Sequence, residues 1–178
     1  MVDMDRFLTL GISDKVLDAF EFIIVPTSHL HMTGFTIAPE ETSVARRAQL
    51  YLQRNHALLD MDLPFCKMGL AHFTCSLMER NCEGSRDDIL DAITDAEYAE
   101  LFARVAKSGM GVELNVNLAD PQSERTMRPY RIAKMQGCKF YLGSDAHHPQ
   151  GLDQARARFC AVIEALELTE ADKFRPFA

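Results

Sequence analysis

Residues 138–148 read CKFYLGSDAHH, and this stretch decides the fold. An apolar run rich in aromatic and aliphatic residues ends at Gly143, and Asp145 and His147 follow within four residues. The run predicts a strand over residues 138–143. Both polar side chains come just after its C-terminal end, which is where folds built on parallel strands carry their chemistry. We therefore expect an α/β fold with a polar site at one edge of a parallel sheet.

The rest of the chain supports this expectation. Helices are predicted between the strands, because apolar residues recur there at helical spacing. In the helix predicted over residues 95–107, Tyr98, Leu101, Phe102 and Val105 form the inner face and Gly109 is the stop. Residues 120–128 are polar and predict a surface loop. The other predicted strands are 21–26, 67–71 and 111–116, and the other predicted helices are 44–59, 129–135 and 152–166. Alternating strands and helices are typical of βα units around a parallel sheet.

Composition narrows the class of protein. The chain has 178 residues, which predicts one domain over residues 1–178. Its net charge of -7 argues against duplex nucleic acid as the main partner. A short oligonucleotide or a nucleotide is still compatible with this charge as a substrate. There is no 18-residue apolar run and no secretion signal, so we expect a soluble cytoplasmic protein without a membrane partner. The five cysteines include no C-x-x-C pair and are expected to be reduced and mostly packed in the interior.

Histidines follow three of the four predicted strands. His29 and His31 follow the first, His72 ends the second, and His147 follows the fourth. If the strands are parallel, these side chains converge at one edge of the sheet. We favour His29 and His72 as metal ligands over buried structural histidines, and leave His31 open, because alternation no longer sets side-chain direction beyond a strand end. His148 precedes Pro149 and is expected behind or beside the ligands.

The Asp145-Ala-His147 triplet has a chemical interpretation and a structural one. Alternate residues after a strand can point into the same cavity, so that carboxylate and imidazole face one metal ion. This donor pair suits zinc, manganese or iron, and paired metals of this kind activate water and polarise a phosphoryl oxygen. The structural alternative is that Asp145 caps the following turn. On the first interpretation, Asp145, His147 and His72 carry a hydrolysis of phosphate esters.

Other polar residues are candidates for supporting roles. Glu113 and Asn115 alternate on the third predicted strand and therefore share a face, where they would orient a ligand imidazole from behind. The alternative is the polar outer face of an ordinary strand. Arginines near the strand ends or helix starts are candidate phosphate contacts, although each is equally an ordinary solvated residue. These arginines are Arg80, Arg125, Arg128 and Arg131.

Four short motifs, taken in order, resemble the later motifs of the PHP (polymerase and histidinol phosphatase) family. They are Thr27-Ser28-His29, Gly69-Leu70-Ala71-His72, Val112-Glu113-Leu114-Asn115 and Gly143-Ser144-Asp145-Ala146-His147. The resemblance extends from about residue 20 to residue 165 and implies a distorted, TIM-like (β/α)7 barrel. It also implies two or three divalent metals, commonly zinc, manganese or iron, and hydrolysis of a small phosphorylated substrate. By the same resemblance, His29, His72, Asp145 and His147 are metal ligands.

The chain departs from this family at its start. The family begins with a His-x-His strand and a Gly-x-Glu strand, whereas here no histidine precedes His29, and Met1-Val2-Asp3 is similar to the tail of the Gly-x-Glu strand. We therefore expect an incomplete, N-terminally truncated barrel. About four strands cannot close a barrel, so a second copy in a homo-oligomer, a separate polypeptide or residues 7–20 would have to cover the open edge. Two alternatives stay open: an inactive metal-binding or interaction module, and another barrel metallohydrolase of the amidohydrolase kind.

Overall fold

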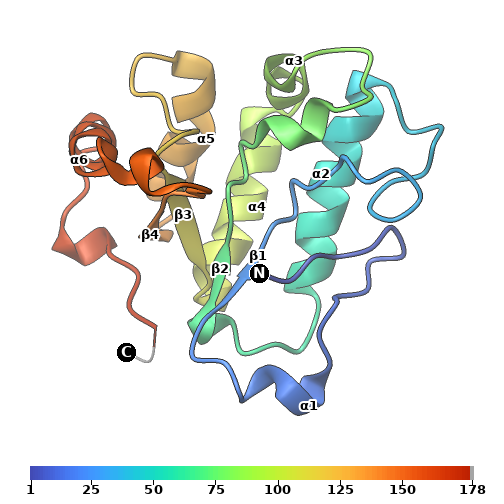
Figure 1. The fold of residues 1–178 in the computed structure, drawn as a ribbon, viewed down its shortest axis with the longest axis horizontal. Helices are drawn as coiled ribbons and strands as arrows, with labels where there is room; N and C mark the ends of the chain where they lie inside the picture. The colour runs from blue at the N-terminus through green and yellow to red at the C-terminus, as the bar shows by residue number, and fades with distance from the viewer. Residues whose placement is uncertain (177–178) are drawn as a thin grey trace.

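The fold is built on one parallel sheet. The computed structural model describes residues 1–176, apart from the side chain of Asp14. Its four strands lie in the order β1-β2-β3-β4, which is also their order in the chain, and all neighbours are parallel (Figure 1). The strands are β1 (Ile23–Val25), β2 (Met68–Leu70), β3 (Gly111–Asn115) and β4 (Lys139–Gly143). The predicted α/β class and all four predicted strands are confirmed.

Helices connect the strands, as the alternating pattern predicted. They are α1 (Asp14–Leu17), α2 (Val44–Leu59), α3 (Arg86–Asp91), α4 (Asp95–Ser108), α5 (Glu124–Met135) and α6 (Ala155–Ala165), with 3-10 turns at Phe65–Lys67, Ser76–Glu79, Pro149–Leu152 and Glu170–Asp172. The bounds of α2 match the prediction. α4 ends at Gly109, whose φ of 78° is one that glycine adopts without strain.

Two helix predictions were wrong in their bounds. α5 begins at Glu124 instead of 129, because Ser123 caps it by accepting a hydrogen bond from the Thr126 backbone N–H. Pro129 therefore lies inside the helix, and much of the predicted surface loop is helical. The helix predicted over 152–166 is shorter, since a 3-10 turn occupies Pro149–Leu152 before α6 begins.

One face of the sheet forms the core with the helices. Alternate strand residues such as Val25, Leu70 and Val112 are no more than 1% exposed and belong to one cluster with the inner residues of α2, α4 and α5. The predicted inner face of α4 is fully within this cluster. Burying each such side chain contributes roughly 1.5–3 kcal/mol. Cys75 and Cys138 are buried as predicted, whereas Cys66 and Cys160 are exposed.

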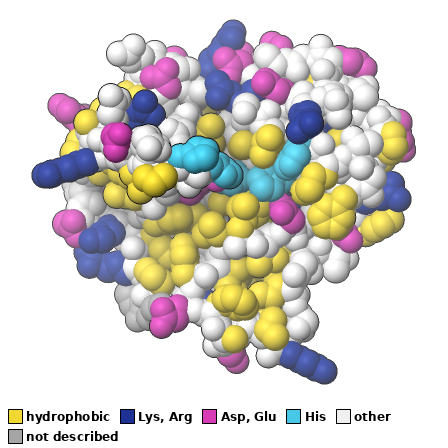
Figure 2. Space-filling view, in the orientation of Figure 1, with side chains coloured by type: hydrophobic (Ala, Val, Ile, Leu, Met, Phe, Trp, Pro, Cys, Tyr) yellow, Lys and Arg dark blue, Asp and Glu magenta, His cyan; other side chains and the backbone are white. Residues whose placement is uncertain are grey.

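The opposite face of the sheet is covered by aromatic rings. Phe22 packs edge-on against Tyr141 at 5.2 Å between ring centroids, and Phe174 lies 6.2 Å from Tyr141. Gly111 leaves room for Phe174, because a Cβ at this position would come within 2.7 Å of the Phe174 ring. Figure 2 shows hydrophobic side chains gathered on the middle of one face, below two neighbouring patches of histidine.

The sheet is open, and its two outer strands are flanked by the ends of the described chain. The Val2 N–H donates to the Ile24 carbonyl oxygen at 2.9 Å, so the N-terminal residues lie beside β1 (Figure 1). On the other side, the Phe174 N–H donates to the Phe140 carbonyl oxygen at 2.8 Å. A closed barrel is therefore not formed by residues 1–176. Among these residues, no helix has both the length and the apolar character needed to cross a bilayer.

Candidate functional site

Three histidines meet beyond the C-terminal ends of β1 and β2. The ring centroids of His29 and His72 are 4.9 Å apart in a stacked arrangement, and those of His29 and His31 are 5.1 Å apart, edge to face. We call His29, His31 and His72 the histidine cluster. His29 and His72 are 6% and 3% exposed. Parallel pairing of β1 with β2 brings residues more than 40 positions apart into this cluster.

The loop after β1 is held in place by buried polar contacts. The Thr27 hydroxyl donates to Asn55 Oδ1 at 2.9 Å, and the Ser28 hydroxyl donates to the His72 carbonyl oxygen at 3.0 Å. His72 itself has a φ of 27°, which is unusual for a residue with a side chain. The two segments that carry the histidine cluster are therefore bonded directly to each other.

Sequence reasoning missed one member of this site, Asp3. Its Oδ1 lies 2.7 Å from His29 Nδ1. Partial burial alone would raise the pKa of the Asp3 carboxyl, but the hydrogen bond and charge of His29, with the charge of Arg54, lower the pKa below its ordinary value. Asp3 and His29 are 26 residues apart in different segments, so no local pattern could have paired them.

Two ring nitrogens in the histidine cluster are buried without a hydrogen-bond partner among residues 1–176, namely Nδ1 of His31 and Nδ1 of His72. Burial lowers the pKa of both imidazoles, and the nearby charge of His29 lowers them further. Both rings therefore favour the neutral form, whose free lone pair is what a transition metal binds. Buried nitrogens of this kind are costly unless something binds them, and imidazole nitrogen is a donor type that zinc, manganese and iron accept.

Glu113 supports His72 from β3. Its Oε2 accepts a hydrogen bond from the backbone N–H of His72, and the Asn115 side-chain amide donates to the same oxygen at 3.4 Å. Burial raises the pKa of Glu113. The two side chains share a face and are both buried, as their alternation predicted. The Glu113 carboxylate fits against β4 only because residue 143 is glycine. A Cβ at position 143 would collide with that carboxylate.

Asp145 borders the same region, whereas His147 and His148 lie outside it. Asp145, His72 and Glu113 line one depression of about 480 Å³, with Phe22 and Tyr141 among its apolar walls. The Asp145 side chain is 47% exposed and that of His147 is 83% exposed, with Oδ1 and Nε2 3.7 Å apart. His148 is also exposed, at the start of the 3-10 turn. The sequence thus placed Asp145 near the histidine cluster, but His147 faces solvent.

The candidate phosphate-binding arginines differ in their surroundings. Arg80 is exposed, and the Arg47 guanidinium donates to its carbonyl oxygen and to that of Leu30, which lies between His29 and His31 in the chain. Arg125 and Arg128 pair with Asp91 and Asp95 at 3.1 and 2.6 Å. Arg131 pairs with Glu124 within α5. The three arginines of α5 are therefore engaged in ion pairs, and Arg80 is the candidate next to the cluster.

The ligand set inferred for the PHP family is only partly assembled. Within residues 1–176, no three His, Cys, Asp or Glu side chains stand in an arrangement that would hold a metal ion. The histidine cluster and Asp145 lie near each other, but His147 would have to turn inward from the loop after β4 to join them.

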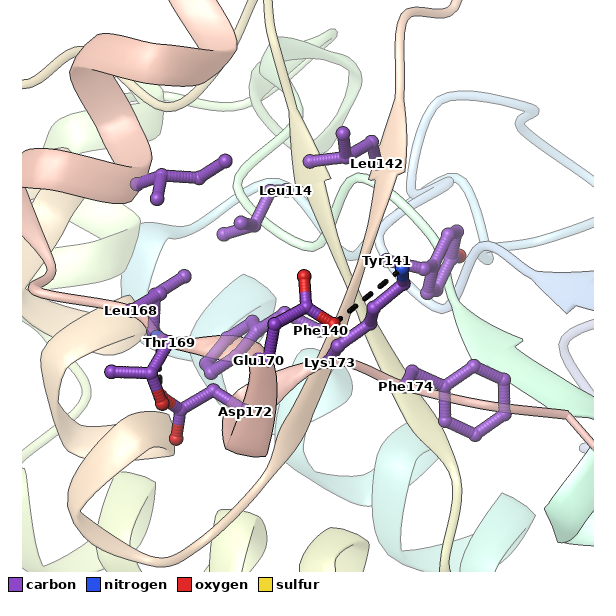
Figure 3. Close-up of a pocket in the computed structure, with 11 residues that line it drawn as sticks. Leu114, Phe140, Tyr141, Leu142, Leu168, Thr169, Glu170, Asp172, Lys173 and Phe174 are labelled. Atoms are coloured by element: carbon purple, nitrogen blue, oxygen red, sulfur yellow. Dashed lines mark hydrogen bonds and ion pairs between the residues drawn. The ribbon is translucent and has the colours of Figure 1, made fainter. Parts of the chain in front are cut away.

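A second hollow lies on the other side of β4. It has a volume of about 390 Å³ and an apolar floor that includes Leu114, Leu142 and Leu168 (Figure 3). Its carboxylates are already engaged: Glu170 pairs with Lys173 at 3.8 Å, and Asp172 accepts hydrogen bonds from Thr169. Its lining contains no histidine or cysteine, so the depression beside His72 is the better candidate for chemistry.

Comparison with known proteins gives no assignment: no family model, no curated protein and no solved structure matches the chain.

Proposed function

We propose that this chain is a metal-dependent phosphoesterase of the PHP type. The observation that carries the proposal is the meeting of His29, His31 and His72 beyond the ends of β1 and β2, beside the depression bordered by Asp145. Imidazole nitrogens with a nearby carboxylate form a donor set suited to zinc, manganese or iron. On this proposal the open sheet is part of a distorted β/α barrel.

Each residue then has a distinct role. His29, His72 and Asp145 would hold the metal, and His147, on the loop after β4, would be a further ligand. A bound metal of this kind would polarise a phosphoryl oxygen and make bound water acidic enough to attack near neutral pH. Arg80, which Arg47 links to the loop that carries the histidines, would hold the phosphate group of a small substrate. Glu113 keeps the His72 backbone in place.

A second candidate function is a metal-binding module without catalysis. The observation that favours it is the 83% exposure of the His147 side chain, which leaves the histidine cluster without its expected fourth ligand. In this case the cluster binds a metal, but no phosphate ester is hydrolysed.

The two candidates are separated by one set of measurements. Protein purified without chelator is analysed for zinc, manganese and iron, and assayed on histidinol phosphate, nucleotide 3′,5′-bisphosphates and short oligonucleotides. The phosphoesterase proposal expects bound metal and hydrolysis in the wild type, and both are lost in His72→Asn. The control is His56→Asn, which should keep both, because His56 lies on α2 and contacts Arg104.

Absence of metal from the wild-type protein, together with no uptake on addition, would sink the proposal. Metal binding with hydrolysis at background on all three substrate classes would favour the inactive module.

A further inference from the structure

Asp3 and His29 form a partly buried pair whose geometry has a chemical consequence. Asp3 Oδ1 lies 2.7 Å from His29 Nδ1, with side-chain exposures of 30% and 8%. An ionised carboxylate can only accept, so Nδ1 must carry the proton. In the neutral ring the other nitrogen, Nε2, is then the one with a free lone pair.

We propose that Asp3 is a positioning residue that fixes the tautomer and the orientation of His29, so that Nε2 is presented as a metal ligand. The inference rests on the proposed metal-binding function of the histidine cluster. A carboxylate behind a ligand histidine holds the ring in place and makes its free nitrogen a stronger donor.

Backbone hydrogen bonds hold the segment around Asp3 in place. The Val2 N–H donates to the Ile24 carbonyl oxygen and the Gly11 N–H donates to the Asp3 carbonyl oxygen, both at 2.9 Å. Met4, the next residue, is fully buried. The carboxylate of Asp3 is therefore presented by a segment that is tied to the outside of β1.

Arg54 ties this segment to the loop that carries His29. Arg54 is 1% exposed, and its guanidinium donates to the Met4 carbonyl oxygen at 2.7 Å and to the Thr27 carbonyl oxygen at 3.0 Å. Arg54 thus binds Met4, which is next to Asp3, and Thr27, which is two positions before His29. Two segments bound to the same buried group keep the carboxylate and the imidazole in register.

The test uses Asp3→Ala, with Asp62→Ala as its control, because Asp62 is an exposed aspartate. Zinc affinity is measured by competition with a chelator, and the tautomer of His29 is read by side-chain ¹⁵N NMR on the metal-free protein. We expect Asp3→Ala to weaken zinc binding by about 10–100-fold and to reduce the Nδ1–H tautomer. Asp3→Asn keeps an acceptor and should lose less affinity, while Asp62→Ala should match the wild type.

The outcomes are distinguishable. Wild-type affinity and an unchanged tautomer in Asp3→Ala would overturn the role of Asp3 while leaving the metal site intact. A wild-type protein that binds no metal would overturn both the proposed function and the role of Asp3 in it. If Asp3→Ala does not fold, Asp3→Leu, which keeps the branched shape but has no acceptor, is held to the same two expectations.

Discussion

Individual residues show how closely the candidate site is packed. Glu113 reaches from β3 to the backbone of His72, and this is sterically allowed because position 143 of β4 is glycine. Alternation along β3 was enough to predict that Glu113 and Asn115 share a face. The direction of His147 was not predictable, because side chains beyond a strand end no longer alternate, and it is 83% exposed.

Gly143→Ala is expected to destabilise the protein. The added methyl group would collide with the Glu113 carboxylate, so either β4 shifts or Glu113 loses its bond to His72. Overpacking of this kind costs about 1–3 kcal/mol of unfolding free energy, measured by urea denaturation. Gly11→Ala is the control, since a Cβ there meets its nearest neighbour at an ordinary 3.4 Å. Equal unfolding midpoints for the two variants would contradict the steric role of Gly143.

At the scale of elements, the apolar patterns located the strands and most helices, because both are set by local periodicity. Capping decided the bounds that the patterns missed. Pro129 suggested a helix start, but Ser123 caps α5 six residues earlier, and a proline is tolerated within the helix. α4 shows the opposite case, since its N-cap Thr94 and its stop at Gly109 agree with the pattern.

The capping box of α4 gives a prediction with a defined pH dependence. The Glu97 carboxylate accepts from the backbone N–H and the hydroxyl of Thr94, and these hydrogen bonds lower the pKa of Glu97. A carboxyl with a lowered pKa in the folded state contributes stability above its ordinary value of 4.5, and this contribution is lost as pH falls through the lowered value.

We therefore expect Glu97→Gln to be less stable than the wild type at neutral pH, and the difference to shrink at acidic pH. Thr94→Ala should cost about 1 kcal/mol at neutral pH, whereas Thr33→Ala, at an exposed position outside the helices, should cost less. Denaturant unfolding at neutral and at acidic pH measures these differences in unfolding free energy. A Glu97→Gln difference that grows on acidification would show that the box does not act through the ionised carboxylate.

At the scale of the whole molecule, the open sheet has to protect its second face without helices. The rings of Phe22, Tyr141 and Phe174 cover that face, and the ends of the described chain flank β1 and β4. Cover for the open edge of the sheet was expected from residues 7–20, another polypeptide or a second copy. In the structure it is residue 2 that bonds to β1.

Phe174→Ala is expected to uncover this face. Phe174 is 8% exposed and lies over Gly111, so its removal leaves a cavity on the sheet. We expect a loss of about 3 kcal/mol in unfolding free energy and increased binding of a dye that reports exposed apolar surface. Phe7→Ala is the matched control, because Phe7 is 74% exposed. If both variants unfold at the same denaturant concentration, Phe174 does not act as cover for the sheet.

The sequence by itself determined the strands, most of the helices and the placement of His29, His72 and Asp145 after strand ends, because these depend on local apolar periodicity and turn residues. Only the tertiary structure decided which of these side chains meet. The pairing of Asp3 with His29, the stacking of His29 on His72 and the outward direction of His147 all depend on the path of distant segments. Contacts across tens of residues arise from strand pairing and from a buried group such as Arg54, and no local pattern encodes them.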